Sequence, residues 1–320
     1  MIIKSRDSID HVVLELESYL KDDRFSDTEK EKIKKDIANI RSGQRNEDQS
    51  AYLINVDYSN SSNWAVIHDL RIESNGFFAQ IDHLIISRTL EFYILESKSF
   101  FNGIKITENG EFLRYEFGKY IPFSSPIEQN RRHIKILESF ISEKHVMPTR
   151  LGFTMVPTFK SLIIVNTSAQ IFRPKQGFDT SSVIKADQIA TTINTEKIGV
   201  LQATSFVSKI VSSSTLKELA LKIASYHQPN HEIMVSKYRN KLAKSDLKKS
   251  QVMTKPETVV GTKEVKNDDT DENPSAPRCD GCGKQISEKT VEFCKFRHKY
   301  YENKTYCVSC QKKFSHEKKK

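Results

Sequence analysis

Two apolar runs within residues 77–98 constrain the fold of this chain more than any other stretch. They are rich in isoleucine, leucine, phenylalanine and tyrosine, which favours two buried β-strands joined by a tight turn near Thr89. Three charged residues, Asp82, Glu96 and Lys98, interrupt the runs. Because side chains alternate between the two faces of a strand, Glu96 and Lys98 point to the same face.

A turn centred at Thr89 places Asp82 opposite Glu96, since each acid lies seven residues from it. Opposed side chains in a hairpin lie roughly 5 Å apart, and two carboxylates at that separation repel by about 3 kcal/mol in a dielectric of about 20. A proton on one acid, the charge of Lys98 or a bound divalent cation would relieve this repulsion. Hard cations such as Mg²⁺ prefer oxygen ligands, and a nearby lysine can orient water or stabilise phosphate charge, so we favour the cation.

The order Asp82 followed by Glu96-x-Lys98 resembles the signature of the PD-(D/E)xK nuclease superfamily. The Gln-Ile-Asp-His stretch at 80–83, with Gly103 further on, is similar more specifically to the NERD (nuclease-related) domain. This resemblance implies an α/β fold with a restriction-endonuclease-like mixed β-sheet flanked by helices. It also implies divalent-metal-dependent hydrolysis of DNA phosphodiester bonds, in DNA processing, repair or defence. The alternative is a surface hairpin that carries a solvated Glu–Lys pair.

The resemblance covers roughly residues 43–165 and implies a role for each charged residue of the hairpin. Asp82 and Glu96 would hold Mg²⁺ or Mn²⁺, with the carbonyl of Ser97 as a further ligand. Lys98 would position the attacking water or stabilise the pentacovalent phosphate.

Three further site residues are carried over from the resemblance. The GQRNE stretch at 43–47 matches the family's Gly-x-x-Gly-Glu helix start, except that asparagine replaces the second glycine. Glu47 would therefore face the metal, and Asp48 is a competing candidate. Gln80, and Gln129 within a Pro-x-x-Gln pattern shared with related domains, would orient groups in the cleft or the phosphate.

The pattern along the chain predicts three segments before the C-terminal region. Residues 8–42 read as two helices, with Gly43 ending the second, and belong to an N-terminal helical segment at 1–42. The nuclease-like core spans 43–200, and a helical extension spans 201–244. Besides the hairpin, we expect strands at 63–72, 104–106, 111–123 and 159–165, and helices at 125–140 and 204–226.

Composition indicates a linker, the cellular compartment and the charge of the protein. Residues 245–277 lack apolar periodicity and are rich in charged and hydroxyl residues, which predicts a flexible linker. No run of about 18 apolar residues predicts a membrane span, and the first residues lack a signal-peptide core, so we expect a cytoplasmic protein. The net charge of +9 permits nucleic-acid binding without demonstrating it.

Four cysteines define a C-terminal module at 278–314, which precedes a basic tail at 315–320. They form two Cys-x-x-Cys pairs, Cys279 with Cys282 and Cys307 with Cys310. This spacing predicts a tetrahedral Zn²⁺ site that supplies much of the folding energy of so short a module, which resembles a zinc ribbon or treble-clef finger. The fifth cysteine, Cys294, has zinc-like spacing to His298, so a site made of Cys279, Cys282, Cys294 and His298 is the alternative.

Two functions from different classes are open. The first is a metal-dependent nuclease acting on DNA, with RNA as the weaker choice of substrate. The second is a non-catalytic nucleic-acid-binding or adaptor protein that uses the zinc finger and the basic tail. The finger combines aromatic and basic residues, which suits nucleic acid, but a protein partner fits the same composition.

Overall fold

The computed structural model describes residues 1–100, 102–116, 118–195, 210–252, 277–296, 301 and 303–311. The chain divides into two compact units, residues 1–255 and 256–320, and each is described by itself. Residues 204–209 of a predicted helix, 253–276 of the predicted linker, and the basic tail lie outside the described residues. None of the described helices combines the length and apolar character needed to cross a lipid bilayer.

A six-stranded mixed sheet forms the centre of the first unit, in the order β1-β2-β3-β4-β10-β12. Its strands are β1 (Ile2–Lys4), β2 (Trp64–Ser74), β3 (Phe77–Ser87), β4 (Glu91–Lys98), β10 (Thr158–Val165) and β12 (Val183–Lys185). The three strands β2, β3 and β4 pair antiparallel, whereas β1 with β2, and β10 with both β4 and β12, pair in parallel. The predicted mixed α/β sheet is confirmed, and the hairpin β3–β4 contains the two apolar runs.

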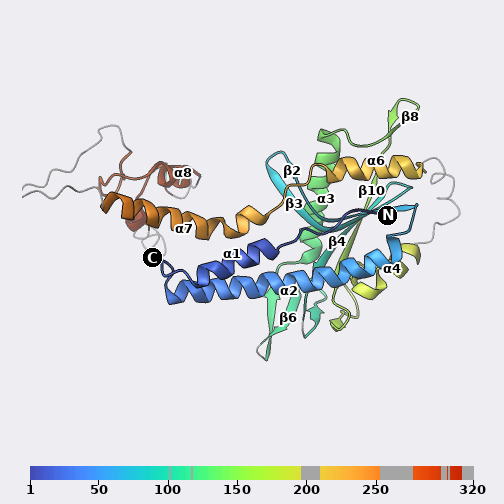
Figure 1. The fold of residues 1–320 in the computed structure, drawn as a ribbon, viewed down its shortest axis with the longest axis horizontal. Helices are drawn as coiled ribbons and strands as arrows, with labels where there is room; N and C mark the ends of the chain where they lie inside the picture. The colour runs from blue at the N-terminus through green and yellow to red at the C-terminus, as the bar shows by residue number, and fades with distance from the viewer. Residues whose placement is uncertain are drawn as a thin grey trace, which may run out of the picture. The chain divides into compact units, whose positions relative to one another are not determined.

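Helices cover both faces of this sheet (Figure 1). One face packs on α3 (Pro126–Glu143) and α6 (Ser213–Ala224), and the other packs on the C-terminal part of α2 (Asp27–Tyr58) together with η1 (Ala186–Gln188) and α4 (Ile189–Thr195). Helix α3 starts where the sequence predicted, because the hydroxyl of Ser125 accepts the N–H of Glu128 and a proline follows at the first helical position.

In β2 and β3 the alternation between the two faces of the sheet is interrupted, at Asp69 in β2 and at Asp82 in β3. Ile67 and Leu70 lie three residues apart yet belong to the same core, and β3 shows the same three-residue step across Asp82. Asp69 has a φ of 50°, a left-handed conformation that is uncommon outside glycine. The strict alternation of a regular strand is therefore broken in both strands beside the candidate acids.

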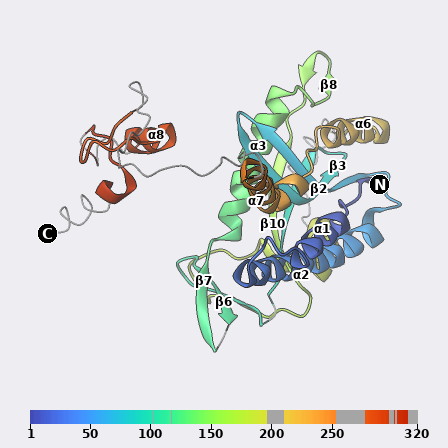
Figure 2. The ribbon, with the colours of Figure 1, turned by 60° about the vertical axis from the view of Figure 1, so that its left-hand side comes forward.

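A smaller four-stranded sheet, in the order β11-β5-β6-β7, packs against β10 and β12. Its strands are β11 (Ile171–Phe172), β5 (Ile104–Ile106), β6 (Phe112–Glu116) and β7 (Lys119–Phe123). Figure 2 shows β6 and β7 projecting as a hairpin from the body of the unit. A separate short hairpin joins β8 (Thr149–Arg150) to β9 (Phe153–Thr154).

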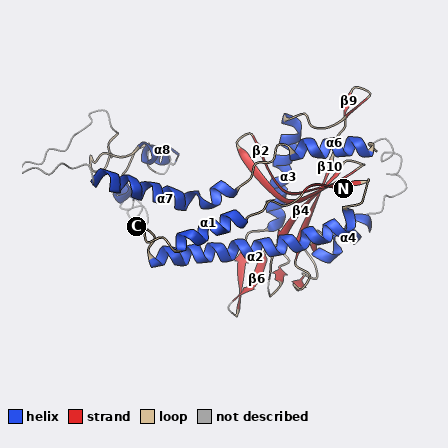
Figure 3. Ribbon diagram, in the orientation of Figure 1, coloured by secondary structure: helices blue, strands red, loops and turns tan. Residues whose placement is uncertain are grey.

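Three helices form a second layer of packing in the same unit (Figure 3). They are α1 (Asp10–Leu20), the N-terminal part of α2, and α7 (His231–Val252), and they share an aliphatic and aromatic core. Helix α2 thus contributes to two cores, through Ile33 in this bundle and through Ile54 under the sheet.

Two boundaries differ from the sequence prediction. Gly43 was expected to end a helix, but α2 continues through it to Tyr58, because Gly43 is not among the glycines with positive φ and apolar residues continue on both sides. Residue 245 was expected to begin the flexible linker, but α7 extends to Val252. Charged residues fit a helix as well as a linker, so composition alone placed this boundary too early.

The second unit contains α8 (Glu288–Phe296), which lies between the two Cys-x-x-Cys pairs in the sequence. A β-bridge joins Arg278 to Gln285 around the first pair. The small core consists mainly of cysteine and aromatic side chains, including Tyr301 and Tyr306. Little aliphatic surface is buried, which agrees with a module that needs more than a hydrophobic core.

Candidate active site and metal centre

The ladder between β3 and β4 ends one residue short of the two acids, Asp82 and Glu96. It pairs His83 with Leu95 and Leu84 with Ile94, which is the register predicted from a turn at Thr89. The backbone N–H of Ser97 donates a 2.7 Å hydrogen bond to Oδ2 of Asp82. One carboxylate of the pair is thus anchored to the strand that carries the other.

The carboxylate of Glu96 is almost fully buried, and its two oxygens differ in their partners. Oε1 accepts hydrogen bonds from Nζ of Lys98 at 2.6 Å and from Nε2 of Gln129 at 2.7 Å. Oε2 is buried without a hydrogen-bond partner in the described part of the chain, with Nδ1 of His133 at 3.5 Å. The structure therefore brings Lys98 and Gln129 together on Glu96, and it leaves one buried acceptor oxygen over.

The surroundings of the two acids shift their pKa values in opposite directions. Burial raises the pKa of Asp82 well above its ordinary value, and the charges of Glu96 and Glu47 raise it further. Burial also acts to raise the pKa of Glu96, but His133 and Lys98 outweigh this and place it below its ordinary value. Asp82 thus holds a proton more readily than Glu96.

Glu47 lies in the middle of α2, not at a helix start, because the helix begins at Asp27. The helix-start interpretation of the GQRNE stretch is therefore wrong. Nη2 of Arg6 lies 2.5 Å from Oε2 of Glu47. Burial raises the pKa of Glu47, and the charge of Arg6 opposes this rise. The charges of Asp69 and Glu96 raise the pKa further, so Glu47 interacts electrostatically with the other acids. Asp48 also pairs with Arg6, but its side chain is 55% exposed, which favours Glu47 as the site residue.

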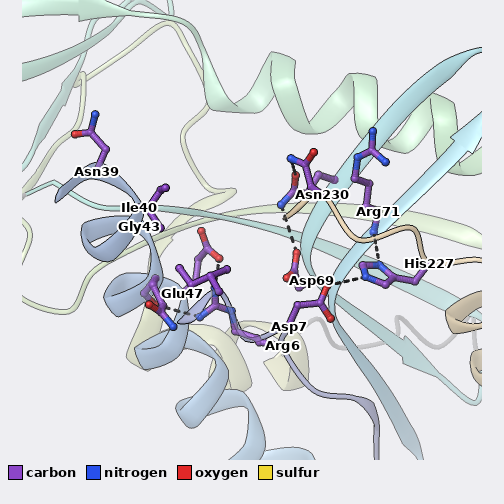
Figure 4. A pocket seen from close by; sticks show the side chains of 13 residues that line it. Arg6, Asp7, Asn39, Ile40, Gly43, Glu47, Asp69, Arg71, His227 and Asn230 are labelled. Atoms are coloured by element: carbon purple, nitrogen blue, oxygen red, sulfur yellow. Dashed lines mark hydrogen bonds and ion pairs between the residues drawn. The ribbon is translucent and has the colours of Figure 1, made fainter. Parts of the chain in front are cut away.

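Gln80 lines a cavity of about 150 Å³ together with Glu47, and Figure 4 shows Glu47, Asp69 and Asn230 around this cavity. Nε2 of Gln80 lies 3.4 Å from Oδ1 of Asp69, and its Oε1 lies 3.4 Å from Nδ2 of Asn230. Arg6 and Asn230 complete the wall of this cavity from outside the predicted core.

Three residues near the acids were not predicted as site residues. His133 follows Gln129 by one helical turn on α3, a spacing that could have suggested a shared face. Asp69 interrupts the apolar alternation of its strand, which was a second available signal. Arg6 reaches Glu47 across 41 residues of sequence, and no local pattern indicates this contact.

Asp82 and Glu96 offer donors of the kind that a divalent cation prefers, but with Glu47 they do not form a cluster of three ligand atoms within 4.8 Å of one another. Among the described residues, the four cysteines are the one group of three or more Cys, His, Asp or Glu whose ligand atoms lie within 4.8 Å of one another. Asp82 and Glu96, whose Oε2 makes no hydrogen bond among the described residues, offer carboxylate oxygens of the kind that hard cations bind. Asp82 and Glu96 are thus suited to be the two protein ligands.

A buried histidine pair lies beside the acids on the face covered by α2. Nδ1 of His68 is 2.8 Å from Nδ1 of His83, and Nε2 of His68 is 3.0 Å from Oδ1 of Asn55. Since the Asn55 oxygen only accepts, His68 donates to it and accepts from His83, which leaves Nε2 of His83 buried without a partner in the described residues. Burial lowers the pKa of His68 to about 4 and that of His83 well below its ordinary value, so both rings are neutral.

The predicted cysteines converge in the second unit. The sulfurs of Cys279, Cys282, Cys307 and Cys310 form the cluster just described. Burial opposes ionisation of Cys279, but the N–H groups of Cys307 and Gly281 outweigh it and lower the pKa of this thiol to about 6. A thiolate stabilised by backbone donors is the species that binds a metal.

Cys294 stands apart from the cluster. It is buried, and its sulfur accepts the N–H of Tyr306 at 3.4 Å and Nε2 of Gln311 at 3.3 Å. His298, its partner in the alternative site, lies outside the described residues. The arrangement favours the four-cysteine site and gives Cys294 a packing role.

Residues 42–165 match the family model of the nuclease-related domain, abbreviated NERD. The matched segment contains Glu47, both acids of the hairpin, Lys98 and Gln129. No curated protein and no solved structure matches the chain.

Proposed function

Because residues 42–165 form a nuclease-related domain, we propose that this chain is a divalent-metal-dependent nuclease that hydrolyses DNA phosphodiester bonds. The observation that carries the proposal is that Asp82 and Glu96 come from adjacent strands, with the N–H of Ser97 on Asp82 and the amine of Lys98 on Glu96. Carboxylates of this kind with a neighbouring amine can serve phosphoryl transfer through electrostatic stabilisation and positioning.

In this proposal Asp82 and Glu96 hold Mg²⁺ or Mn²⁺, with the Ser97 carbonyl as a further ligand. When bound, the ion supplies Lewis-acid polarisation of the phosphate and activation of water. Glu47 adds negative charge on the side of α2, held by Arg6. Gln129 keeps the carboxylate of Glu96 in place through its 2.7 Å hydrogen bond.

Lys98 has the geometry of a group that acts on the phosphate. Its side chain is 28% exposed, while that of its partner Glu96 is 4% exposed, so the amine lies at the boundary between the buried acid and solvent. An ammonium group has three N–H donors, and the bond to Glu96 uses one. The others can orient a water molecule or donate to a phosphate oxygen as negative charge develops there.

The finger and the location of the protein complete the proposal. We assign Zn²⁺ to the four cysteines and infer that the finger adds a contact to nucleic acid or to a protein partner. A cytoplasmic location agrees with cysteines that are grouped for metal binding and form no disulfides among the described residues.

A nicking assay on supercoiled plasmid, with Mg²⁺, with Mn²⁺ and without divalent cation, tests this function. Cleavage should need the cation and should be lost in Asp82→Asn. The matched control is Glu138→Gln, which removes an exposed carboxylate from α3 and should cleave normally. Single-stranded DNA and RNA substrates in the same assay separate the substrate classes. Cleavage that persists unchanged in Asp82→Asn would remove the site assignment.

One observation favours the second candidate, a non-catalytic nucleic-acid-binding protein. Oε1 of Glu96 already accepts two hydrogen bonds, and Asp82, Glu96 and Glu47 do not form a cluster of three ligand atoms. Absence of cleavage of every DNA and RNA form, with binding equal in the wild type and in Asp82→Asn, would support this candidate.

A further inference from the structure

The outer face of the small sheet carries exposed aromatic side chains that the candidate active site does not use. The register pairs Tyr115 with Tyr120 and Lys105 with Leu113, so these residues lie on one face. Phe172 joins the same face through its pairing with Lys105. We call this surface, made of Lys105, Leu113, Tyr115, Tyr120, Pro122 and Phe172, the aromatic face.

The opposite face of the small sheet accounts for its packing, so the aromatic face is not needed for the core. Ile104, Ile106 and Phe112 are buried against β10 and β12. By contrast, Tyr115, Tyr120 and Phe172 are 41%, 43% and 40% exposed. Three rings left in solvent on adjoining strands form a surface that can contact a partner.

The charge on the aromatic face is positive. Nζ of Lys105 lies 5.2 Å from the ring centroid of Tyr120, and the Tyr115 and Tyr120 rings are 5.3 Å apart. None of the described side chains on this face, within the four strands, is acidic. Glu116 belongs to the opposite face, where its carboxylate lies 3.3 Å from Nε of Arg114.

The strands that carry most of the aromatic face are close in sequence to residues of the candidate active site. β5 begins six residues after Lys98, and β7 ends three residues before α3, the helix that carries Gln129. The candidate site residues Lys98 and Gln129 therefore flank strands β5, β6 and β7 in the sequence.

We propose that the aromatic face binds single-stranded nucleic acid, with bases stacked on Tyr115, Tyr120 and Phe172 and a phosphate next to Lys105. Exposed sheets with aromatic rings and cations suit unpaired bases, because every base has a π-face, whereas the bases of a duplex are already stacked. This inference rests on the proposed function and narrows its substrate to nucleic acid that contains an unpaired segment.

Binding of fluorescein-labelled 20-nucleotide single strands, DNA and RNA, and of a 20-base-pair duplex tests this proposal by fluorescence anisotropy. The full chain is used without added divalent cation, so that the outcome does not depend on cleavage. The doubly substituted Tyr115→Leu/Tyr120→Leu should bind single strands about ten-fold more weakly, with duplex affinity unchanged. The matched pair Tyr115→Phe/Tyr120→Phe retains both rings and should bind as the wild type does.

Two controls make the result specific. Tyr52→Leu removes a tyrosine that is 67% exposed on α2 and should leave single-strand affinity unchanged. Lys105→Gln should reduce the slope of log affinity against log salt concentration by about 0.7, the value for one phosphate contact to a single strand. Circular dichroism of each variant confirms that the fold is intact.

Equal single-strand affinity in the wild type and in Tyr115→Leu/Tyr120→Leu would overturn the proposal, as would equal losses for single strands and duplex. Single-strand binding that depends on these rings in a protein without nuclease activity would support the aromatic face and reject the proposed catalysis. Failure of the aromatic-face proposal can therefore be distinguished from failure of the proposed nuclease activity.

Discussion

Nζ of Lys98 lies 2.6 Å from Oε1 of Glu96, which joins a partly exposed amine to a carboxylate that is almost fully buried. A buried charge that loses its partner is costly, so the pair also contributes to folding. A test of Lys98 must therefore separate its chemistry from its structural contribution.

We predict that Lys98→Met lowers the nicking rate by about 100-fold or more, because one donor to developing negative charge is typically worth that much. Affinity for Mn²⁺, followed by electron paramagnetic resonance, should stay within about three-fold of the wild type, since both acids remain. Lys135→Met, which removes an exposed lysine from α3, is the matched control. A normal rate, or a loss of Mn²⁺ affinity as large as the loss of rate, would contradict a catalytic role.

Asp82→Asn should stabilise the metal-free protein at neutral pH. Burial and the charges of Glu96 and Glu47 raise the pKa of Asp82, so its contribution to stability is complete below its unfolded pKa and is lost as the pH rises through the folded value. Asparagine carries no charge and therefore removes the cost of an ionised carboxylate at this buried position. Its side-chain oxygen can still accept the N–H of Ser97. We expect a gain on the order of 1 kcal/mol, or about 2–4 °C in Tm.

The same thermal scans with Mn²⁺ distinguish a metal ligand from a poorly placed acid. The ion should raise the Tm of the wild type and leave that of Asp82→Asn unchanged, because ligand binding stabilises only the protein that binds it. Glu138→Gln should respond as the wild type does. A Tm for Asp82→Asn below that of the wild type without metal would contradict this account.

The histidine pair predicts a loss of stability in mild acid. Burial lowers the pKa of His68 to about 4, so its stabilising contribution is complete above the unfolded value of about 6.5 and declines as the pH falls towards 4. Urea unfolding at pH 7 and pH 5 should show a smaller decline for His68→Gln than for the wild type. Equal declines would mean that folding does not lower the pKa of His68, which would contradict this account.

Zinc content tests the finger. We predict one Zn²⁺ for each chain, released by a chelator with loss of structure in the second unit, as expected when the metal supplies folding energy. Cys282→Ser should abolish the stoichiometric zinc, whereas Cys294→Ser should retain it because this sulfur lies outside the cluster. Cys307→Ser distinguishes the two ligand sets, because Cys307 belongs to the four-cysteine cluster alone. Zinc retained in Cys307→Ser and lost in Cys294→Ser would support the alternative ligand set.

The sequence alone could place the hairpin and the register of its strands. A turn near Thr89 suffices to predict the register of the β3–β4 ladder up to His83 and Leu95, because this constraint acts within a few residues. The start of α3 was equally accessible, since Ser125 and the following proline are local signals. The spacing of the cysteines likewise predicted their convergence.

Features that depend on distant contacts could not be predicted in this way. Gly43 continues α2 because the helix packs at both ends, through Ile33 in the bundle and Ile54 under the sheet. Arg6 reaches Glu47, and Asn230 reaches Gln80, only after the segments flanking the nuclease-related domain have folded onto it. No local periodicity encodes these contacts.

The central claim is that Asp82 and Glu96 share one divalent cation. The most direct test is a crystal structure of the protein soaked with Mn²⁺, with anomalous scattering measured at the manganese edge. We predict an anomalous peak within ligand distance of a carboxylate oxygen from each acid, close to Nζ of Lys98. A map with no peak between the two acids, at a Mn²⁺ concentration that supports cleavage, would contradict the claim.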